Sequence, residues 1–303
     1  MPEWDAEHVV DAGLARRLIA EQFPQIELAS LRALGEGWDA TVWLADGRWV
    51  FRFPRRQVVL APAEREFALL RRLAPLVPAP IPQPVFAGRP AHGYPWPFYG
   101  APYLEGDELA HVVLSDADRT ALAPALARFL LALHDPATLA EFRDDHLPVD
   151  GNRRSDMRLR VPWTRERLAT VAGLGLWTPP PVVAEWLDAA LELEPSPATA
   201  LVHGDLHFRH LLIAGGSLAG VIDWIDLGVA DRAVDLLLVW CLFDPDARRA
   251  FVDVYGPMTE AEQLRSRVLA VFLCATLAEY GRREGLPAVE REALAGLERA
   301  VIG

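Results

Sequence analysis

Secondary-structure signals change along this chain near Gly106, with strand patterns before that residue and helical patterns after it. Between residues 27 and 56, apolar side chains recur at every second position, which is typical of strands with one buried face. Residues 115–135 follow the apolar spacing of a long amphipathic helix instead. We therefore expect two domains, 1–105 and 106–303, of the size that a chain of this length usually forms.

The strand pattern of the first domain separates a cation from its aromatic neighbours. The aromatic residues within 49–53 alternate with Val50 and Arg52, so Arg52 points to the face opposite the aromatics. Gly35 and Gly37 precede this strand, and a loop without side chains can approach a phosphate closely. We expect a glycine loop and a fixed cation on one face of the sheet, although such a glycine pair more often marks a plain turn.

A helix with a buried face is predicted after Pro62, and Glu66 falls within it. The Glu66 carboxylate can pair with Arg52 or, as is commoner, with arginines on its own helix surface. Residues 74–98 contain too many prolines for a helix or a central strand. We expect an extended connection there, with one edge strand near Val85.

Composition excludes several classes of protein. The chain of 303 residues is 51% hydrophobic and 24% charged, as a globular protein is. Its start lacks the pattern of a signal peptide, and no apolar run approaches the ~18 residues of a membrane span, so a cytoplasmic protein is expected. The formal net charge of -12 disfavours nucleic acid as a partner and suits a cationic small molecule. All 30 basic residues counted as lysine or arginine are arginine, so any role that usually needs lysine must fall to arginine.

Residues 201–224, LVHGDLHFRHLLIAGGSLAGVIDW, place ionisable groups beside two short apolar runs that read as a β-hairpin. If Gly216-Ser217 is the turn, then His210 lies directly opposite Asp223, and one cation can contact both side chains. A shift of the turn by one residue removes that pairing. Asp205 precedes the hairpin, where its carboxylate can accept a proton from a hydroxyl.

Other polar residues of this region have simpler interpretations. His203 is expected to be a core histidine that holds the loop through its ring nitrogens, and His207 to position the loop rather than bind metal. Asp231 and Asp235 are expected to be helix N-caps.

The string His203-Gly204-Asp205, followed by His210 and by Val221-Ile222-Asp223-Trp224, resembles the catalytic and metal-binding motifs of the aminoglycoside phosphotransferase family. Gly35-Glu36-Gly37-Trp38 is similar to the phosphate loop of that family, and residues 49–56 and 64–73 to its third strand and first helix. The resemblance covers roughly residues 30 to 235. It implies an α+β, protein-kinase-like fold with two lobes, a small antiparallel-sheet N-lobe and a larger, mainly helical C-lobe.

The resemblance also implies roles for individual residues. Asp205 would orient or deprotonate the acceptor hydroxyl, and Arg209 would stabilise the transferred phosphoryl group or else contact acidic residues nearby. The metal-binding residues would be His210 and Asp223, and the residues that bind ATP or GTP would be Gly35, Gly37, Arg52, Glu66, Pro102 and Leu104. Pro102 would offer its carbonyl and Leu104 its N–H to the adenine.

Two residues depart from the family pattern. His210 stands where asparagine is usual, and imidazole prefers softer metals than Mg²⁺, so Mn²⁺ is a second candidate ion. Arg52 stands where lysine is usual, and its planar guanidinium also binds phosphate.

The first functional hypothesis is a kinase that moves the γ-phosphate to a hydroxyl of an aminoglycoside- or macrolide-like molecule. A metabolic kinase for choline, amino alcohols or sugars is a second hypothesis within the same class. A metal-dependent hydrolase that uses the His/Asp cluster, and a nucleotide-binding module without catalysis, remain alternatives. Acceptor contacts are expected from residues 150–163 and 279–284, whose acidic side chains would suit a cationic acceptor. The sequence leaves the oligomeric state open.

Overall fold

A computed structural model describes residues 6–37 and 39–302 and divides the chain into two compact units. Unit 1 comprises Met1–Pro75 and Pro80–Glu105, and unit 2 comprises Leu76–Ala79 and Gly106–Gly303. Trp38 of the expected phosphate loop lies outside the described residues.

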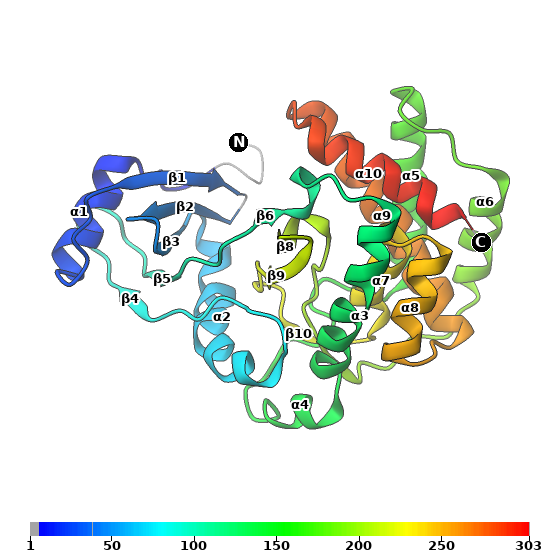
Figure 1. Cartoon of the computed structure of the whole chain (residues 1–303), viewed down its shortest axis with the longest axis horizontal. Coiled ribbons are helices and arrows are strands. Elements are labelled where there is room, and N and C mark those ends of the chain that lie inside the picture. Colours follow the sequence, from blue (N-terminus) through cyan, green and yellow to red (C-terminus); the bar gives the residue numbers. More distant parts are fainter. Residues whose placement is uncertain (1–5, 38, 303) are drawn as a thin grey trace. The chain divides into compact units, whose positions relative to one another are not determined.

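Unit 1 is built on an antiparallel sheet with the strand order β1-β2-β3-β5-β4 (Figure 1). Its elements are α1 (Ala12–Gln22), β1 (Leu31–Glu36), β2 (Ala40–Ala45), β3 (Trp49–Pro54), α2 (Leu60–Leu73), β4 (Phe86–Gly88) and β5 (Phe98–Pro102), with a short 3-10 turn at Gln57–Val59. The β2–β3 turn uses Asp46 and Gly47, whose φ angles of 53° and 65° match the positive values that tight hairpin turns require. As expected, the strand after Val85 lies at the sheet edge, where a proline-rich neighbourhood is tolerated.

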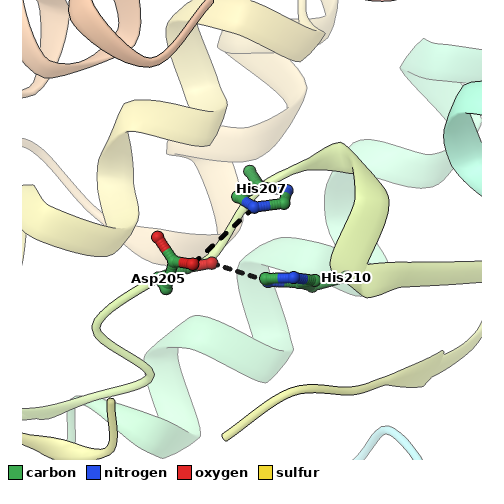
Figure 2. A group of neighbouring side chains, drawn as sticks. All are labelled: Asp205, His207 and His210. Carbon is green, nitrogen blue, oxygen red and sulfur yellow. Dashed lines mark hydrogen bonds and ion pairs between the residues drawn. The ribbon is translucent and has the colours of Figure 1, made fainter. Parts of the chain in front are cut away.

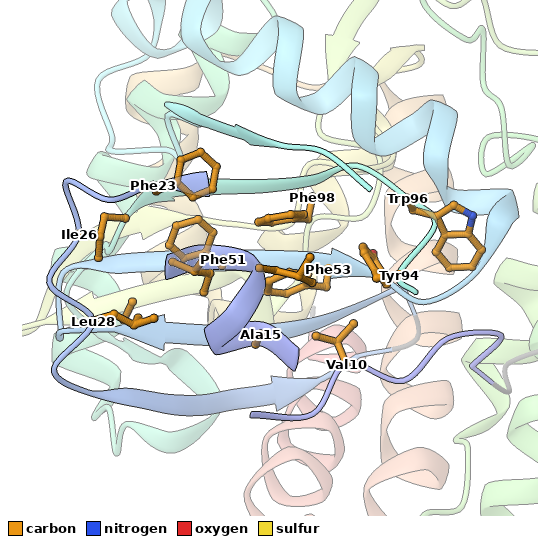
Figure 3. Close-up of a cluster of buried hydrophobic side chains, with 13 residues drawn as sticks. Val10, Ala15, Phe23, Ile26, Leu28, Phe51, Phe53, Tyr94, Trp96 and Phe98 are labelled. Atoms are coloured by element: carbon orange, nitrogen blue, oxygen red, sulfur yellow. The ribbon is translucent and has the colours of Figure 1, made fainter. Parts of the chain in front are cut away.

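One face of this sheet carries the aromatic core of unit 1. Phe51, Phe53 and Phe98 are fully buried: Phe98 stacks on Phe53 and packs at a tilt against Phe51, which stacks on Phe23 after α1 (Figure 3). Burial of such rings contributes about 1.5–3 kcal/mol each. Because the aromatic face is committed to this core, Arg52 projects from the opposite face, as the alternation predicts.

Unit 2 is mainly helical. Its helices are α3 (Asp116–Leu133), α4 (Pro136–Ala140), α5 (Met157–Gly173), α6 (Pro181–Leu191), α7 (Ala233–Leu242), α8 (Pro245–Tyr255), α9 (Glu260–Arg283) and α10 (Pro287–Val301). Short 3-10 turns occur at Leu109–His111 and Phe208–His210, and another, Ala74–Leu76, crosses from unit 1 into unit 2. Its strands are β6 (Asp107–Glu108), β7 (Ala200–Val202), β8 (Leu211–Ala214), β9 (Ser217–Val221) and β10 (Gly228–Ala230). Helix α9 packs against α5, α7 and α10 and forms the centre of the unit. Within the part of the chain that the structure describes, no helix combines the length and apolar character needed to span a membrane.

The β8–β9 hairpin has a different register from the one predicted. Ala214 pairs with Ser217, so the turn is Gly215-Gly216, whose φ angles of 56° and 75° suit a two-residue turn better than Gly216-Ser217 would. A register shift after Leu212 then adds one residue to β9. As a result the His210 carbonyl accepts a hydrogen bond from the Ile222 N–H at 2.9 Å, and the predicted direct pairing of His210 with Asp223 was wrong by one residue.

Candidate active site

Asp223 contacts His210 although the two residues are not paired in the hairpin, because the backbone bends at Asp223. Asp223 follows the end of β9 and has a φ angle of 67°, a left-handed conformation that aspartate tolerates better than most residues. One carboxylate oxygen, Oδ2, lies 3.4 Å from Nε2 of His210. The predicted pair therefore forms at the hairpin end through a bend in the chain.

His210 presents a ring nitrogen that is suited to a cation. Its Nδ1 lies 2.8 Å from the Asp205 carbonyl oxygen and donates to it, so in a neutral ring Nε2 carries the lone pair. That lone pair faces the Asp223 carboxylate, an arrangement that calls for a proton or a metal ion between the two groups. Ligand atoms of Asp205, His207 and His210 also lie within 4.8 Å of one another, with both rings turned toward Asp205 (Figure 2). These donors fit a divalent ion.

The hydrogen bonds of His203 and His207 tie both rings to the backbone of the loop. His203 is fully buried; its Nδ1 accepts from the Asp205 N–H at 3.3 Å, and its Nε2 donates to the Ile222 carbonyl at 3.0 Å. His207 Nδ1 accepts from the Arg209 N–H at 3.2 Å, so the proton sits on Nε2, 3.8 Å from the Asp205 carboxylate. Burial lowers the pKa of both rings and keeps them neutral. Both histidines hold the loop, as predicted.

Asp235 anchors the candidate catalytic loop, residues 203–210, from inside the core. Its carboxylate is fully buried and accepts hydrogen bonds from the N–H groups of His203 at 2.8 Å and Gly204 at 3.1 Å. His134 Nε2 contacts it at 3.2 Å, and His134 Nδ1 in turn contacts the Tyr255 hydroxyl at 2.7 Å. The prediction of a helix N-cap at Asp235 was wrong, because this side chain turns to the loop backbone instead of to its own helix. In the sequence, an aspartate near the start of a helix looks the same whether it caps that helix or binds the backbone of another segment.

Asp231 binds the start of α7 as the N-cap prediction requires, although the N-cap position itself is Arg232 and Asp231 lies one residue before it. Its Oδ1 accepts from the Ala233 N–H at 2.8 Å, at the start of α7. The other oxygen, Oδ2, pairs with the buried Arg265 guanidinium at 2.9 Å.

Asp205 is held by an arginine that sequence reasoning missed. Nη1 of Arg154 lies 2.8 Å from the Asp205 carboxylate, and Nη2 of Arg154 lies 2.5 Å from that of Asp226. Burial alone would raise the pKa of Asp205, but Arg154 and the three nearby histidines lower it to about 2. Arg154 is 51 positions before Asp205, and only the expectation of acceptor contacts from residues 150–163 pointed to this segment.

Arg209 contacts an acidic residue nearby, which is one of the roles expected for it. Its Nε lies 3.6 Å from the Glu108 carboxylate, and its guanidinium carbon lies 5.6 Å from the centre of the Tyr280 ring. The guanidinium beside Asp205 is that of Arg154, so the contacts seen here lend no support to phosphoryl stabilisation by Arg209.

In unit 1, Glu66 pairs with Arg52, the less common of the two outcomes considered from the sequence. Arg52 Nη1 donates to Glu66 Oε1 at 3.0 Å, and the Glu66 side chain is only 9% exposed, so the pair is not a solvated helix-face contact. The glycine loop lies in the same unit: Gly35 ends a register shift in β1, and the Gly37 carbonyl accepts from Arg55 Nη1 at 2.8 Å.

The end of β5 exposes the polar groups expected to read adenine. The Tyr103 N–H donates to the Arg48 carbonyl at 2.8 Å, so Tyr103 turns its backbone toward the β3 side. Backbone groups alternate sides along a strand, so the Pro102 carbonyl at the end of β5 turns to the β4 side, and Leu104 follows two residues beyond the strand. There the last β4-side hydrogen bond runs from the Val85 N–H to the Gly100 carbonyl, before either residue is reached.

Comparisons with known proteins agree with this architecture. An aminoglycoside 3'-phosphotransferase of Escherichia coli is 35% identical over 79 residues, which are 25% of this chain and 29% of that enzyme, so the match spans less than a third of the relative. The solved GDP complex of wild-type aminoglycoside 2'-phosphotransferase-IIIa has a TM-score of 0.65 at 25% identity and covers 94% of this chain and 97% of that one. The apoenzyme of macrolide 2'-phosphotransferase MphH from Brachybacterium faecium has a TM-score of 0.60 at 24% identity, covers 93% of this chain and 97% of that one, and shares the fold.

The expected α+β, kinase-like architecture is thus confirmed. A family model described as "Phosphotransferase enzyme family" matches residues 30–269, which include Arg52, Glu66, Asp205, His210 and Asp223. The chain belongs to the phosphotransferase enzyme family.

Proposed function

We propose that this chain transfers the γ-phosphate of ATP or GTP to a hydroxyl group of a small molecule. The observation that carries the proposal is an ionised carboxylate, Asp205, fixed beside the His210–Asp223 pair in a member of the phosphotransferase enzyme family. The names of the relatives support it, since they are aminoglycoside and macrolide phosphotransferases and one was solved with GDP.

Asp205 orients the acceptor hydroxyl by accepting its hydrogen bond. A carboxylate with a pKa of about 2 is a weak base, so it takes the proton only when the hydroxyl oxygen has begun to bond to phosphorus. Arg154 keeps the carboxylate ionised, and the bond network of Asp235 fixes the loop that carries it.

His210 and Asp223 would hold a divalent cation, which when bound neutralises charge on the nucleotide phosphates. The mixed nitrogen and oxygen donors favour Mn²⁺ more than an all-oxygen site would, while Mg²⁺ remains the ion most available to a kinase. In unit 1, Arg52 would grip a phosphate, with Glu66 fixing its guanidinium, and Gly35 and Gly37 would let the loop backbone approach.

The adenine contacts would come from the backbone beyond β5. Proline has no backbone N–H, but Pro102 would use only its carbonyl as an acceptor. Leu104 would donate its N–H to the ring. The acceptor would be aminoglycoside- or macrolide-like, or an amino alcohol or sugar of metabolism.

The test measures nucleotide binding and transfer separately. Thermal unfolding of the purified chain with ATP, GTP or ADP should show stabilisation that depends on Mg²⁺ or Mn²⁺. An acceptor screen with γ-labelled nucleotide should then yield a phosphorylated alcohol, and Asp205→Asn should lower kcat by about 10²–10⁴-fold without weakening nucleotide binding. Tightly bound zinc or iron with no nucleotide effect would favour the hydrolase, and binding without transfer to any alcohol would favour the non-catalytic module.

A further inference from the structure

The two glycines of the proposed phosphate loop are not required by the geometry of the folded chain. Neither Gly35 nor Gly37 has a positive φ angle. Besides its chain neighbours, a Cβ atom added at Gly35 would have none of the described atoms within 4 Å, and one added at Gly37 would lie 3.8 Å from the Ala40 carbonyl oxygen, an ordinary contact. Glycine at both positions therefore leaves room that the described chain does not fill, as the close approach of a ligand to the backbone requires.

The glycine loop, residues 35–40, is bonded to the segment that follows β3. Arg55 donates its backbone N–H to the Asp39 carbonyl at 2.9 Å and its Nη1 to the Gly37 carbonyl at 2.8 Å. Nη2 of Arg56 lies 2.6 Å from the Asp39 carboxylate. The loop also closes on itself, because the Gly37 N–H donates to the Ala40 carbonyl at 3.1 Å. Two consecutive arginines thus hold the loop at Gly37 and at Asp39, and we call these contacts the loop clamp.

The backbone that carries the two arginines is itself fixed. The buried Tyr94 hydroxyl donates to the Pro54 carbonyl at 2.8 Å. The Glu7 N–H donates to the Arg55 carbonyl at 2.9 Å, and the Glu7 carboxylate accepts from the Gln57 N–H at 3.1 Å. Side chains that start from a fixed backbone lose less conformational freedom when they bind, so the loop clamp is a preorganised contact.

The loop clamp also relates the glycine loop to Arg52. Arg52 pairs with Val42 in the β2–β3 ladder. Two positions further on, Pro54 pairs with Ala40, the last residue of the loop. The clamp adds bonds to the same loop from the residues just after Pro54. The sheet and the clamp together therefore hold the loop at one position relative to Arg52, the cation proposed to bind phosphate.

We propose that Arg55 and Arg56 are positioning residues for the nucleotide phosphates. They hold the glycine loop beside Arg52 and so raise the affinity for the phosphate part of the nucleotide, and they act through the loop rather than by touching the phosphates. A binding group that is already in place loses less entropy when its ligand arrives. The inference rests on the proposed phosphotransfer and adds two residues to its nucleotide site.

The test compares a nucleotide with its nucleoside. Dissociation constants for ADP and GDP with Mg²⁺ are measured by calorimetry on the whole chain, and the tighter of the two is used with its unphosphorylated nucleoside, whose binding is followed by ligand-observed NMR. Arg55→Gln and Arg56→Gln should each raise the Kd of the diphosphate about tenfold, the effect of losing one charge-assisted hydrogen bond. The Kd of the nucleoside should change less than about twofold, because the nucleoside has no phosphate for the loop to contact.

Two further variants separate the clamp from a general loss of charge or stability. Arg55→Lys keeps a cationic donor and should retain the diphosphate affinity within about threefold. Arg17→Gln is the matched control, since Arg17 is an exposed arginine of the same unit on α1, which packs against the aromatic core instead of the loop. It should leave both dissociation constants unchanged. Thermal unfolding without ligand checks that each variant is folded.

A double-mutant cycle decides whether Arg56 acts through the loop. If Arg56 works by holding Asp39, then Arg56→Gln should cost less than about twofold in diphosphate affinity in the Asp39→Asn background, where that ion pair is already lost. A guanidinium that touched the phosphate directly would cost as much in that background as in the wild type.

The outcomes separate the inference from the proposed function. An unchanged diphosphate Kd in either glutamine variant, an equal loss of nucleoside affinity, an equal loss in Arg17→Gln, or an Arg56→Gln effect that persists in the Asp39→Asn background overturns the inference. A wild type that binds neither nucleotide overturns the inference together with the proposed function. Diphosphate binding that the variants weaken as expected, without transfer from ATP or GTP to any alcohol, supports the inference and overturns the proposed transfer.

Discussion

At the scale of single residues, His210 should decide which metal the proposed site prefers, if it is a ligand as we propose. Its Nε2 is the nitrogen donor in a pair whose other member, Asp223, offers oxygen. Replacing that nitrogen by an amide oxygen should favour the harder ion. We expect His210→Asn to raise the ratio of Mg²⁺-supported to Mn²⁺-supported activity by about tenfold. The measurement is kcat/KM at saturating concentrations of each ion, and an unchanged ratio would show that His210 is not a ligand.

Gly204 is required by backbone geometry rather than by chemistry. Its φ angle is 88°, and a Cβ atom there would lie 2.3 Å from the Asp226 carbonyl oxygen. Gly204→Ala must therefore displace either the loop or the segment after β9, and we expect it to lower the free energy of unfolding by about 2 kcal/mol or more and to abolish activity. Gly173→Ala is the control, because that position has no atom within 4 Å of the added Cβ and no positive φ. Urea unfolding of both variants checks the contrast, which fails if Gly204→Ala is as stable as the control.

At the scale of elements, the strands of unit 1 were predictable because one face is buried and the other is not. Because only one face is buried, aromatic residues alternate with other residues from Trp49 to Phe53, and this alternation indicates the face on which Arg52 lies. The β8–β9 hairpin is buried along most of its length, so alternation could not fix its register, and two adjacent glycines left two possible turns. His210 contacts Asp223 although the predicted register was wrong, because the backbone at Asp223 is left-handed. The sequence does not reveal that backbone conformation.

The sequence could not predict the distant residues that bind the loop around Asp205, for a related reason. Asp235 and Arg154 each bind the catalytic loop from a distant element, and nothing in the local pattern of a helix start or a loop records that partner. Motif spacing identified Asp205, His210 and Asp223 because these residues lie on one hairpin and its approach.

The anchoring of the loop by α7 has a measurable consequence. In Asp235→Asn, an amide NH₂ replaces one oxygen that accepts an N–H bond, and a buried donor then faces a donor. We expect a loss of about 1–3 kcal/mol in the free energy of unfolding and a fall in kcat at unchanged nucleotide KM. Asp244→Ala removes only the N-cap of α8 and should cost about 1 kcal/mol with no change in kcat. If the two variants had the same kcat, Asp235 would be a stabilising residue without a positioning role.

At the scale of the whole molecule, the absence of lysine determines which cation holds the proposed catalytic carboxylate. The chain has a net charge of -12 and contains no lysine, so the cation that holds Asp205 is a guanidinium, that of Arg154. A guanidinium can bridge two carboxylates at once, as Arg154 does between Asp205 and Asp226, and a single ammonium would do so with poorer geometry.

That bridge should make the stability of unit 2 depend on pH in a predictable way. The pKa of Asp205 falls from 3.8 to about 2 in the folded chain, and a lowered carboxyl pKa stabilises the fold above the unfolded value and loses that effect as pH falls. The full contribution is about 2 kcal/mol, of which about half is lost by pH 3. Urea unfolding of the wild type and of Asp205→Asn at pH 5.5 and pH 3 isolates it, since the other carboxyls titrate in both proteins. The wild type should lose about 1 kcal/mol more than the variant between these two pH values. Equal losses would mean that Arg154 does not hold Asp205 in its ionised form, and the account of Asp205 as a weak base that acts late in phosphoryl transfer would fail with it.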